Sequence, residues 1–169
     1  MTRRTAKSIP ARDRWPAPEP HSEGGRLLTE IILTTFRLNA RLLDVAQELA
    51  AHGDITAAWW QVLGGVLDQP RTVSDIGRRM GLTRQAVQRI ADVLVDRGLA
   101  AYEANPSHRR ASLVACTEAG YWAIRRIAVA QHPWANGVAA RVGARDLARM
   151  LATMQQLLAA LEPPVTSAR

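Results

Sequence analysis

Three side chains that can form paired hydrogen bonds with DNA bases occur close together in this chain, at Gln85, Gln88 and Arg89. A glutamine amide can pair with adenine and an arginine guanidinium with guanine, through the base edges exposed in the major groove. The apolar residues of the same segment recur at i, i+3, i+4 and i+7: Val87, Ile90, Ala91 and Leu94. This spacing predicts a helix with one apolar stripe toward a core. The polar side chains then lie together on the other side, where they could read base sequence.

Two short helices are predicted to position these side chains. Thr72 is the expected N-cap of the first helix, with Asp75 as its capping-box partner, and Gly81 is the expected stop. Thr83 is the expected cap of the second helix, and Gly98 its C-terminal stop. This order predicts a helix-turn-helix whose second helix enters the major groove.

A hairpin is predicted directly after the second helix. Residues 99–103 and 111–116 have strand patterns and are separated by the turn Asn105-Pro106-Ser107. Arg109 and Arg110 lie near the tip, where guanidinium groups suit phosphates or a narrow minor groove. An isolated arginine pair is usually a solvated surface pair. Its place just after a capped helix favours a DNA contact.

The ordered combination of these motifs resembles the MarR family of winged helix-turn-helix transcription regulators. The matching text is DIGRRMGLTRQAVQRIADVLVDRGL, the wing text HRRA and the closing TEAG, within a resemblance over residues 26–161. The resemblance implies a mainly α fold with a small β-wing, and homodimers that mostly repress from palindromic operators until a small aromatic molecule or an oxidant releases them. The chain departs at His108, where the family commonly has an acidic residue. The wing therefore has no carboxylate at this position to pair with an arginine. The simpler interpretation is that His108 is a tolerated wing-tip residue with no special role.

Double-stranded DNA is the partner that these motifs predict. We call the predicted helix-turn-helix the reader and the hairpin after it the wing. The expected contact residues carry hydroxyl, amide or guanidinium groups on these two parts: Thr72, Ser74, Thr83, Arg84, Gln85, Gln88, Arg89, Arg109 and Arg110. Among them, Thr72 and Ser74 are expected to hold phosphate through hydroxyl and backbone N–H groups.

Composition agrees with an anionic partner. The 169 residues carry a net charge of +7, which comes almost entirely from arginine because Lys7 is the single lysine. A basic chain suits nucleic acid, an acidic membrane surface or merely an arginine-rich coding bias. No stretch is apolar enough to cross a bilayer and no secretory signal begins the chain, so a cytoplasmic location is expected.

No metal or other cofactor is predicted. The single Cys116 excludes an internal disulfide and a cysteine-rich zinc site, and its place in the expected wing favours a structural role over an oxidant sensor. The four histidines show no ligand spacing. An enzyme is not expected, since no nucleophile with a plausible base, no suitable carboxylate pair and no phosphate-binding glycine loop occurs.

Long helices are expected on both sides of the reader. Residues 26–51 form one amphipathic pattern, residues 118–140 a helix that Pro133 should bend or divide, and residues 147–161 a second apolar stripe. The small winged core cannot cover both stripes, so pairing with a second copy is favoured over an intramolecular bundle. The expected organisation is an arm over residues 1–25, a MarR-like domain over residues 26–162 and a tail over residues 163–169. Within the domain, the winged helix is expected over about residues 55–116, and the dimerisation helices over about residues 26–52 and 118–162.

The resemblance also implies an effector cleft near a helix expected over residues 56–67. Its expected lining has three tryptophans that could stack on a planar ligand and two polar candidates: Trp59, Trp60, Trp122, Arg37 and His52. A core role is the commoner use of such tryptophans, and of the adjacent pair one should point inward and the other outward.

The sequence thus predicts a homodimeric, sequence-specific DNA-binding regulator, a repressor released by a small aromatic effector. Two alternatives stay open. One is an architectural DNA binder of low specificity, which would bind unrelated duplexes with nearly equal affinity. The other is an adaptor whose winged helix docks on a protein, although such a helix would more often expose apolar anchors than a basic face.

Overall fold

The computed structural model describes residues 19–108 and 110–161. Arg109, most of the arm predicted over residues 1–25, and the tail from residue 163 lie outside the described residues. The chain divides into two compact units, Met1–Arg41 and Leu42–Arg169, which are described separately.

Helix α1 (Glu23–Ala50) begins in the first unit and ends in the second. It starts three residues before the predicted position because Ser22 caps it: the Gly25 N–H donates to Ser22 Oγ at 3.0 Å. This bond satisfies one of the N–H groups that a helix start leaves free, so the helix begins here although its second and third residues are Gly24 and Gly25. The large apolar side chains of α1 within the first unit are exposed: Leu27, Leu28, Ile31, Ile32, Leu33, Phe36 and Leu38.

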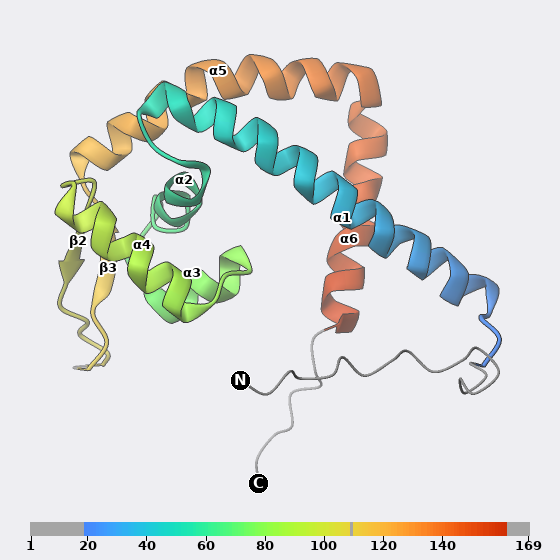
Figure 1. Ribbon diagram of the computed structural model, residues 1–169, viewed down its shortest axis with the longest axis horizontal. Coiled ribbons are helices and arrows are strands. Elements are labelled where there is room, and N and C mark those ends of the chain that lie inside the picture. The colour runs from blue at the N-terminus through green and yellow to red at the C-terminus, as the bar shows by residue number, and fades with distance from the viewer. Residues whose placement is uncertain (1–18, 109, 162–169) are drawn as a thin grey trace, which may run out of the picture. The chain divides into compact units, whose positions relative to one another are not determined.

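The second unit contains the winged helix and two further helices (Figure 1). After the end of α1, its elements follow in this order: a 3-10 turn η2 (Ala51–Gly53), α2 (Ala57–Gly64), β1 (Arg71–Thr72), α3 (Val73–Met80), α4 (Arg84–Asp96), β2 (Ala100–Glu103), β3 (Leu113–Cys116), α5 (Glu118–Val142) and α6 (Ala144–Leu161).

Threonine caps begin four of these helices. Thr56, Thr72, Thr83 and Thr117 each accept a bond from the backbone N–H three residues later, at 3.2 Å. Such a bond satisfies an otherwise free N–H group of the first turn. The predicted caps of the two reader helices, Thr72 and Thr83, are confirmed.

Glycines in the left-handed conformation end the two reader helices. Gly81 follows α3 at φ 65°, and Gly98 lies two residues after α4 at φ 69°. Glycine adopts this conformation without the steric cost that a Cβ atom brings. The predicted stops are confirmed, and they separate the reader helices from each other and from the wing.

The wing is part of a three-stranded antiparallel sheet in the order β1-β3-β2. Strands β2 and β3 match the predicted hairpin, with Tyr102 opposite Val114 and Ala100 opposite Cys116. Strand β1 was not predicted, because two residues are too short to show an alternating pattern. It joins the start of α3 to the wing through the pairing of Thr72 with Leu113.

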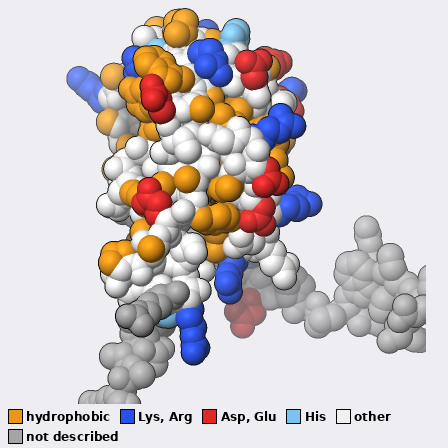
Figure 2. Space-filling model, turned by 90° about the vertical axis from the view of Figure 1, so that its left-hand side faces the viewer, with side chains coloured by type: hydrophobic (Ala, Val, Ile, Leu, Met, Phe, Trp, Pro, Cys, Tyr) orange, Lys and Arg blue, Asp and Glu red, His pale blue; other side chains and the backbone are white. Residues whose placement is uncertain are grey.

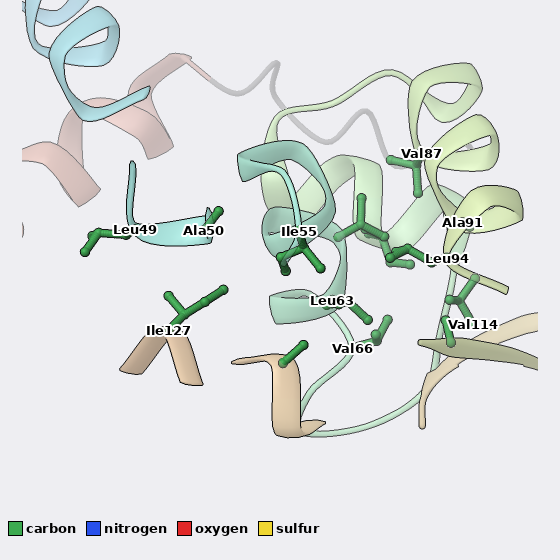
Figure 3. Packing of buried hydrophobic residues seen from close by; sticks show 14 residues of the cluster. Leu49, Ala50, Ile55, Leu63, Val66, Val87, Ala91, Leu94, Val114 and Ile127 are labelled. Carbon is green, nitrogen blue, oxygen red and sulfur yellow. The ribbon is translucent and has the colours of Figure 1, made fainter. Parts of the chain in front are cut away.

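The core of the second unit lies beneath α4. Val87, Ala91 and Leu94 are fully buried, and Figure 3 shows Val87 and Leu94 directed from α4 toward the interior. The fourth residue of the predicted stripe, Ile90, is partly buried and packs against the same cluster. The apolar stripe is confirmed, and its burial leaves the opposite side of α4 toward solvent.

The helices after the wing are long. Helix α5 continues through Pro133 without a break, so Pro133 does not divide it, and the alternative of a bend stays a prediction. Proline removes one helix hydrogen bond, which the many remaining bonds of a 25-residue helix can tolerate. Gly143, at φ 94°, separates α5 from α6, and none of the residues of α6 is buried. Across the described ranges, no helix is both long and apolar enough to cross a membrane.

Candidate nucleic-acid interface

The solvent side of α4 carries the predicted base-reading residues. Arg84, Gln85 and Arg89 are exposed and Gln88 is half-buried. With Asp92 they line a hollow of about 380 Å³. Amide and guanidinium groups are therefore gathered on one helix face, as the sequence predicted.

A second hollow connects this face with the wing. Its volume is about 320 Å³, and it is lined by residues from the start of α3, from α4 and from the wing: Thr72, Val73, Ser74, Arg84, Gln88, Tyr102, Arg110, Ala111 and Ser112. Five of the predicted DNA-contact residues thus surround one concave surface. Thr83 lines neither hollow and serves as the cap of α4.

Thr72 uses its hydroxyl group within the protein. The oxygen accepts from the Asp75 N–H at 3.2 Å, and the hydroxyl donates to Asp75 Oδ2 at 2.5 Å. The predicted capping box is therefore altered, because the short aspartate side chain takes the hydroxyl proton and also pairs with Arg78. This leaves Ser74 as the better placed hydroxyl for a phosphate at the start of α3.

The wing turn is organised by Asn105. Its side-chain Oδ1 accepts from the Ser107 N–H at 3.0 Å, and its carbonyl accepts from the His108 N–H at 3.3 Å. This is the local bonding that makes asparagine favourable in turns. His108 and Arg110 are both exposed on this turn.

Sequence reasoning missed Tyr102, which joins the wing to α4. Gln88 Nε2 donates to the Tyr102 hydroxyl at 2.7 Å and to Asp92 Oδ1 at 2.9 Å, and the hydroxyl donates to the same carboxylate oxygen at 2.6 Å. Burial, together with the bond to Asp92, raises the pKa of Tyr102 to about 12. The tyrosine was visible within a predicted strand, but a strand pattern alone does not show which helix residue its side chain meets.

Arg71 has a structural role that the sequence did not reveal. Its residue is 7% exposed, and its guanidinium donates to the Gly65 carbonyl at 2.7 Å and to Asp68 Oδ2 at 2.7 Å. The Arg71 guanidinium holds the pKa of the Asp68 carboxyl well below its usual range. A buried cation with these partners is not available to a nucleic acid.

Further cations lie on α3, the first reader helix. Arg78 and Arg79 are exposed and line a hollow of about 330 Å³ with Gln69, Pro70, Arg71 and Asp75. Figure 2, which looks at the wing side, shows arginine side chains projecting from the surface with acidic side chains between them. The positive charge is thus distributed over several short segments.

The predicted effector residues are separated into different settings. Trp59 and Trp60 are both half-buried and pack against the core, so the expected inward and outward split is wrong. The Arg97 guanidinium lies 5.2 Å from the centre of the Trp59 ring, which suits a cation–π contact. Trp122 is exposed, and its Nε1 donates to Glu118 at 3.3 Å.

The two polar candidates are exposed. His52 lies in η2, whereas Arg37 belongs to the first unit and donates to Thr34 Oγ1 at 3.4 Å. The three hollows around the reader are lined by none of the five predicted effector residues. Their role in a ligand site stays a prediction.

Cys116 is half-buried beside the core, and its thiol donates to the Thr117 carbonyl at 3.4 Å. Burial raises the pKa of the Cys116 thiol, which disfavours the reactive thiolate. This setting supports the structural role. Among the residues that the structure describes, no group of three or more histidine, cysteine, aspartate or glutamate residues could hold a metal ion.

Comparison with known proteins gives matches in sequence and in structure. A family model described as "MarR family" matches residues 53–111. An uncharacterized protein of Mycobacterium tuberculosis is 40% identical over 93 residues, which cover 55% of this chain and 65% of that protein. The chain thus spans just under two thirds of the length of this curated relative.

Solved structures share the fold. A mutant MarR of E. coli, solved in complex with operator DNA, has a TM-score of 0.68 at 19% identity and covers 81% of this chain and 99% of its own. The Staphylococcus aureus MarR, solved with salicylate and kanamycin, has a TM-score of 0.68 at 15% identity, with 82% and 95% covered. The MarR family model thus matches the segment that holds the helix-turn-helix and most of the wing, and the chain shares the fold of solved MarR structures.

Proposed function

We propose that this protein is a sequence-specific regulator that binds double-stranded DNA as a homodimer and represses transcription from a palindromic operator. The observation that carries this proposal is the hollow in which Arg84 and Gln88 of α4 lie with Ser74 and Arg110. Base-reading groups and phosphate-binding groups share one concave surface there. A recognition helix needs this combination, because phosphate contacts fix its position while base contacts select the sequence.

The buried stripe of α4 supports direct reading of bases. Val87, Ala91 and Leu94 are fully buried, so the helix is held firmly and its polar side faces outward. A paired contact from Gln85 or Arg89 to its preferred base is worth about 1–3 kcal/mol of discrimination. The E. coli MarR, which shares the fold, was solved in complex with operator DNA, and this supports DNA as the partner.

The apolar surface of α6 supports the homodimer. No residue of this 18-residue helix is buried, and Leu151, Leu158 and Leu161 are 58%, 63% and 70% exposed. Apolar side chains at helical spacing that a chain leaves uncovered are expected to pack against a partner. Two copies related by a two-fold axis would present two recognition helices to two half-sites, which explains a palindromic operator.

A small aromatic effector is the proposed signal for release. The Staphylococcus aureus MarR was solved with salicylate, which supports a ligand of this class for the fold. The residues proposed for the site remain the five that were predicted from the sequence: Arg37, His52, Trp59, Trp60 and Trp122. A ligand would lower the affinity for DNA if it bound better to a dimer whose two recognition helices are not spaced to enter successive major grooves. We also propose a cytoplasmic location, because a regulator of this kind must reach the DNA that it controls.

Selection of bound duplexes from a random-sequence pool at near-physiological salt tests this function. Unrelated competitor DNA should be present, because electrostatic binding alone falls steeply with salt. Enrichment of one roughly palindromic motif is the expected result. Retention of duplexes with no shared motif would favour the architectural alternative, and no retention by folded protein would favour the adaptor.

A further inference from the structure

We infer that Tyr102 and Asp92 determine the base preference of Gln88 by leaving its amide only a hydrogen-bond acceptor for DNA. The inference rests on the proposed function and deepens it, since it names the base class that one residue of the reading face selects. It changes the expectation from sequence, which was paired recognition of adenine by a free glutamine amide.

The count of donors in the network leads to this restriction. A glutamine amide has two N–H donors and one carbonyl acceptor. Gln88 Nε2 lies 2.9 Å from Asp92 Oδ1 and 2.7 Å from the Tyr102 hydroxyl, so both donors have partners within the protein. The single hydroxyl proton of Tyr102 is directed to Asp92 Oδ1 at 2.6 Å, which leaves the hydroxyl oxygen free to accept from Gln88.

The orientation of the amide follows from charge. If the amide were reversed, its carbonyl oxygen would face the Asp92 carboxylate, and two acceptors without a proton between them repel. The carboxylate therefore holds Nε2 toward itself and turns Gln88 Oε1 away. Because Gln88 lines both hollows of the reading face, Oε1 is the amide atom left for a base.

The wing holds the tyrosine in place. Tyr102 lies in β2 opposite Val114 of β3, and Val114 is fully buried. Its pKa of about 12 means that the hydroxyl is protonated at neutral pH and can donate to Asp92. The network therefore joins the wing to α4.

An acceptor in the major groove meets a donor on only two bases. Adenine presents its N6 amino group and cytosine its N4 amino group, whereas guanine and thymine present acceptors at the corresponding positions. Gln88 should thus accept adenine and cytosine and reject the other two. Without Tyr102, one N–H of Gln88 is released, and the amide can then pair with both N6 and N7 of adenine.

The test compares duplex selection by the full-length protein with selection by three variants. Gln88→Ala identifies the base pair that Gln88 reads, as the position whose preference disappears. At that position, wild type should enrich adenine and cytosine over guanine and thymine. Tyr102→Phe should raise the ratio of adenine to cytosine by about fivefold or more. This rise corresponds to about 1 kcal/mol from the second hydrogen bond, between the released N–H of Gln88 and adenine N7.

Tyr121→Phe is the matched control, because it removes the hydroxyl of the other tyrosine, which lies on α5. Its base profile should equal that of wild type, and thermal unfolding should show that all variants are folded. An unchanged ratio of adenine to cytosine in Tyr102→Phe would overturn the inference, as would a uniform loss of affinity, which indicates a merely structural role. The proposed function survives both results if wild type still enriches a motif. No enriched motif with wild type would overturn the proposed function and the inference together.

Discussion

At the scale of single residues, the reading face depends on side chains that the fold leaves free. Arg89 is exposed and lines the hollow on α4 with Gln85 and Asp92. Replacing Arg89 with Ala should reduce discrimination at one base pair by about 1–3 kcal/mol and relax selectivity there. Competition binding with single-base variants of the selected duplex measures this change.

Arg125→Ala on α5 is the control for charge, because Arg125 is also exposed. It should leave the base profile unchanged. Equal losses from both variants at every duplex would show that Arg89 acts only through its charge.

The ion pair of Asp68 with buried Arg71 should make stability depend on acid pH. The pKa of Asp68 is lowered in the folded protein, chiefly by its hydrogen bond to Arg71, so the pair stabilises the fold fully above the unfolded pKa of about 4. That contribution is lost as the pH falls below this value. Asp68→Asn should therefore lower the free energy of unfolding at pH 7, and the difference from wild type should shrink below about pH 4.

Urea unfolding at both pH values measures the effect. Asp146→Asn, which removes an exposed ion pair with Arg149, should change stability little at either pH. A deficit of Asp68→Asn that is the same at pH 7 and pH 3 would contradict the assigned cause.

Residue types alone predicted some of this surface and not the rest. The hydroxyl, amide and guanidinium groups at Thr72, Gln88 and Arg110 were visible in the sequence, and the structure brings them to one hollow. The partners of Gln88 were not visible, because Tyr102 is 14 residues away and reaches it only after the wing folds back. Nor did the sequence separate Arg71, which is buried, from the exposed arginines.

At the scale of elements, local signals predicted most boundaries. The caps at Thr72 and Thr83 and the stops at Gly81 and Gly98 are short-range features that a sequence displays directly. Two boundaries were not predicted: the cap at Ser22, which lies before a glycine pair, and strand β1, which exists only because β3 pairs with it. Pairing between distant segments has no local pattern, so a two-residue strand cannot be read from the sequence.

The junction between the wing and α5 should tolerate no added atom at Gly120. A Cβ atom there would lie 2.1 Å from the Leu99 carbonyl oxygen, and this backbone carbonyl cannot move as a side chain can. Gly120→Ala should therefore destabilise the protein by about 1–3 kcal/mol or more. Urea unfolding at one fixed protein concentration measures the change.

Gly64→Ala is the matched control, since Gly64 ends α2 and a Cβ atom there meets nothing within 4 Å. It should be neutral or stabilising by roughly 0.5 kcal/mol, because alanine favours a helix over glycine. Equal stability of the two variants would contradict the close contact at Gly120.

At the scale of the whole molecule, the exposed stripe of α6 predicts a dimer. Leu158 is 63% exposed, so Leu158→Glu should leave the fold of one chain intact while it places a charge in the proposed interface. Wild type should sediment at twice the chain mass of 18.5 kDa, and the variant should shift toward a single chain. Analytical ultracentrifugation measures both.

Gln156→Glu adds the same charge on the opposite side of α6 and should remain dimeric. A monomeric wild type, or an unchanged mass for Leu158→Glu, would contradict the use of this stripe. The sequence predicted both the stripe and its pairing with a second copy, and the exposure of α6 in the structure supports that pairing.

The most direct test of the central claim is the ratio of two dissociation constants at near-physiological salt. One is for the selected duplex, and the other is for a scrambled duplex of the same length and composition. A sequence-specific regulator should bind the selected duplex about a thousandfold more tightly, or better. Equal affinities would contradict specific reading by α4 and leave an architectural DNA binder as the function.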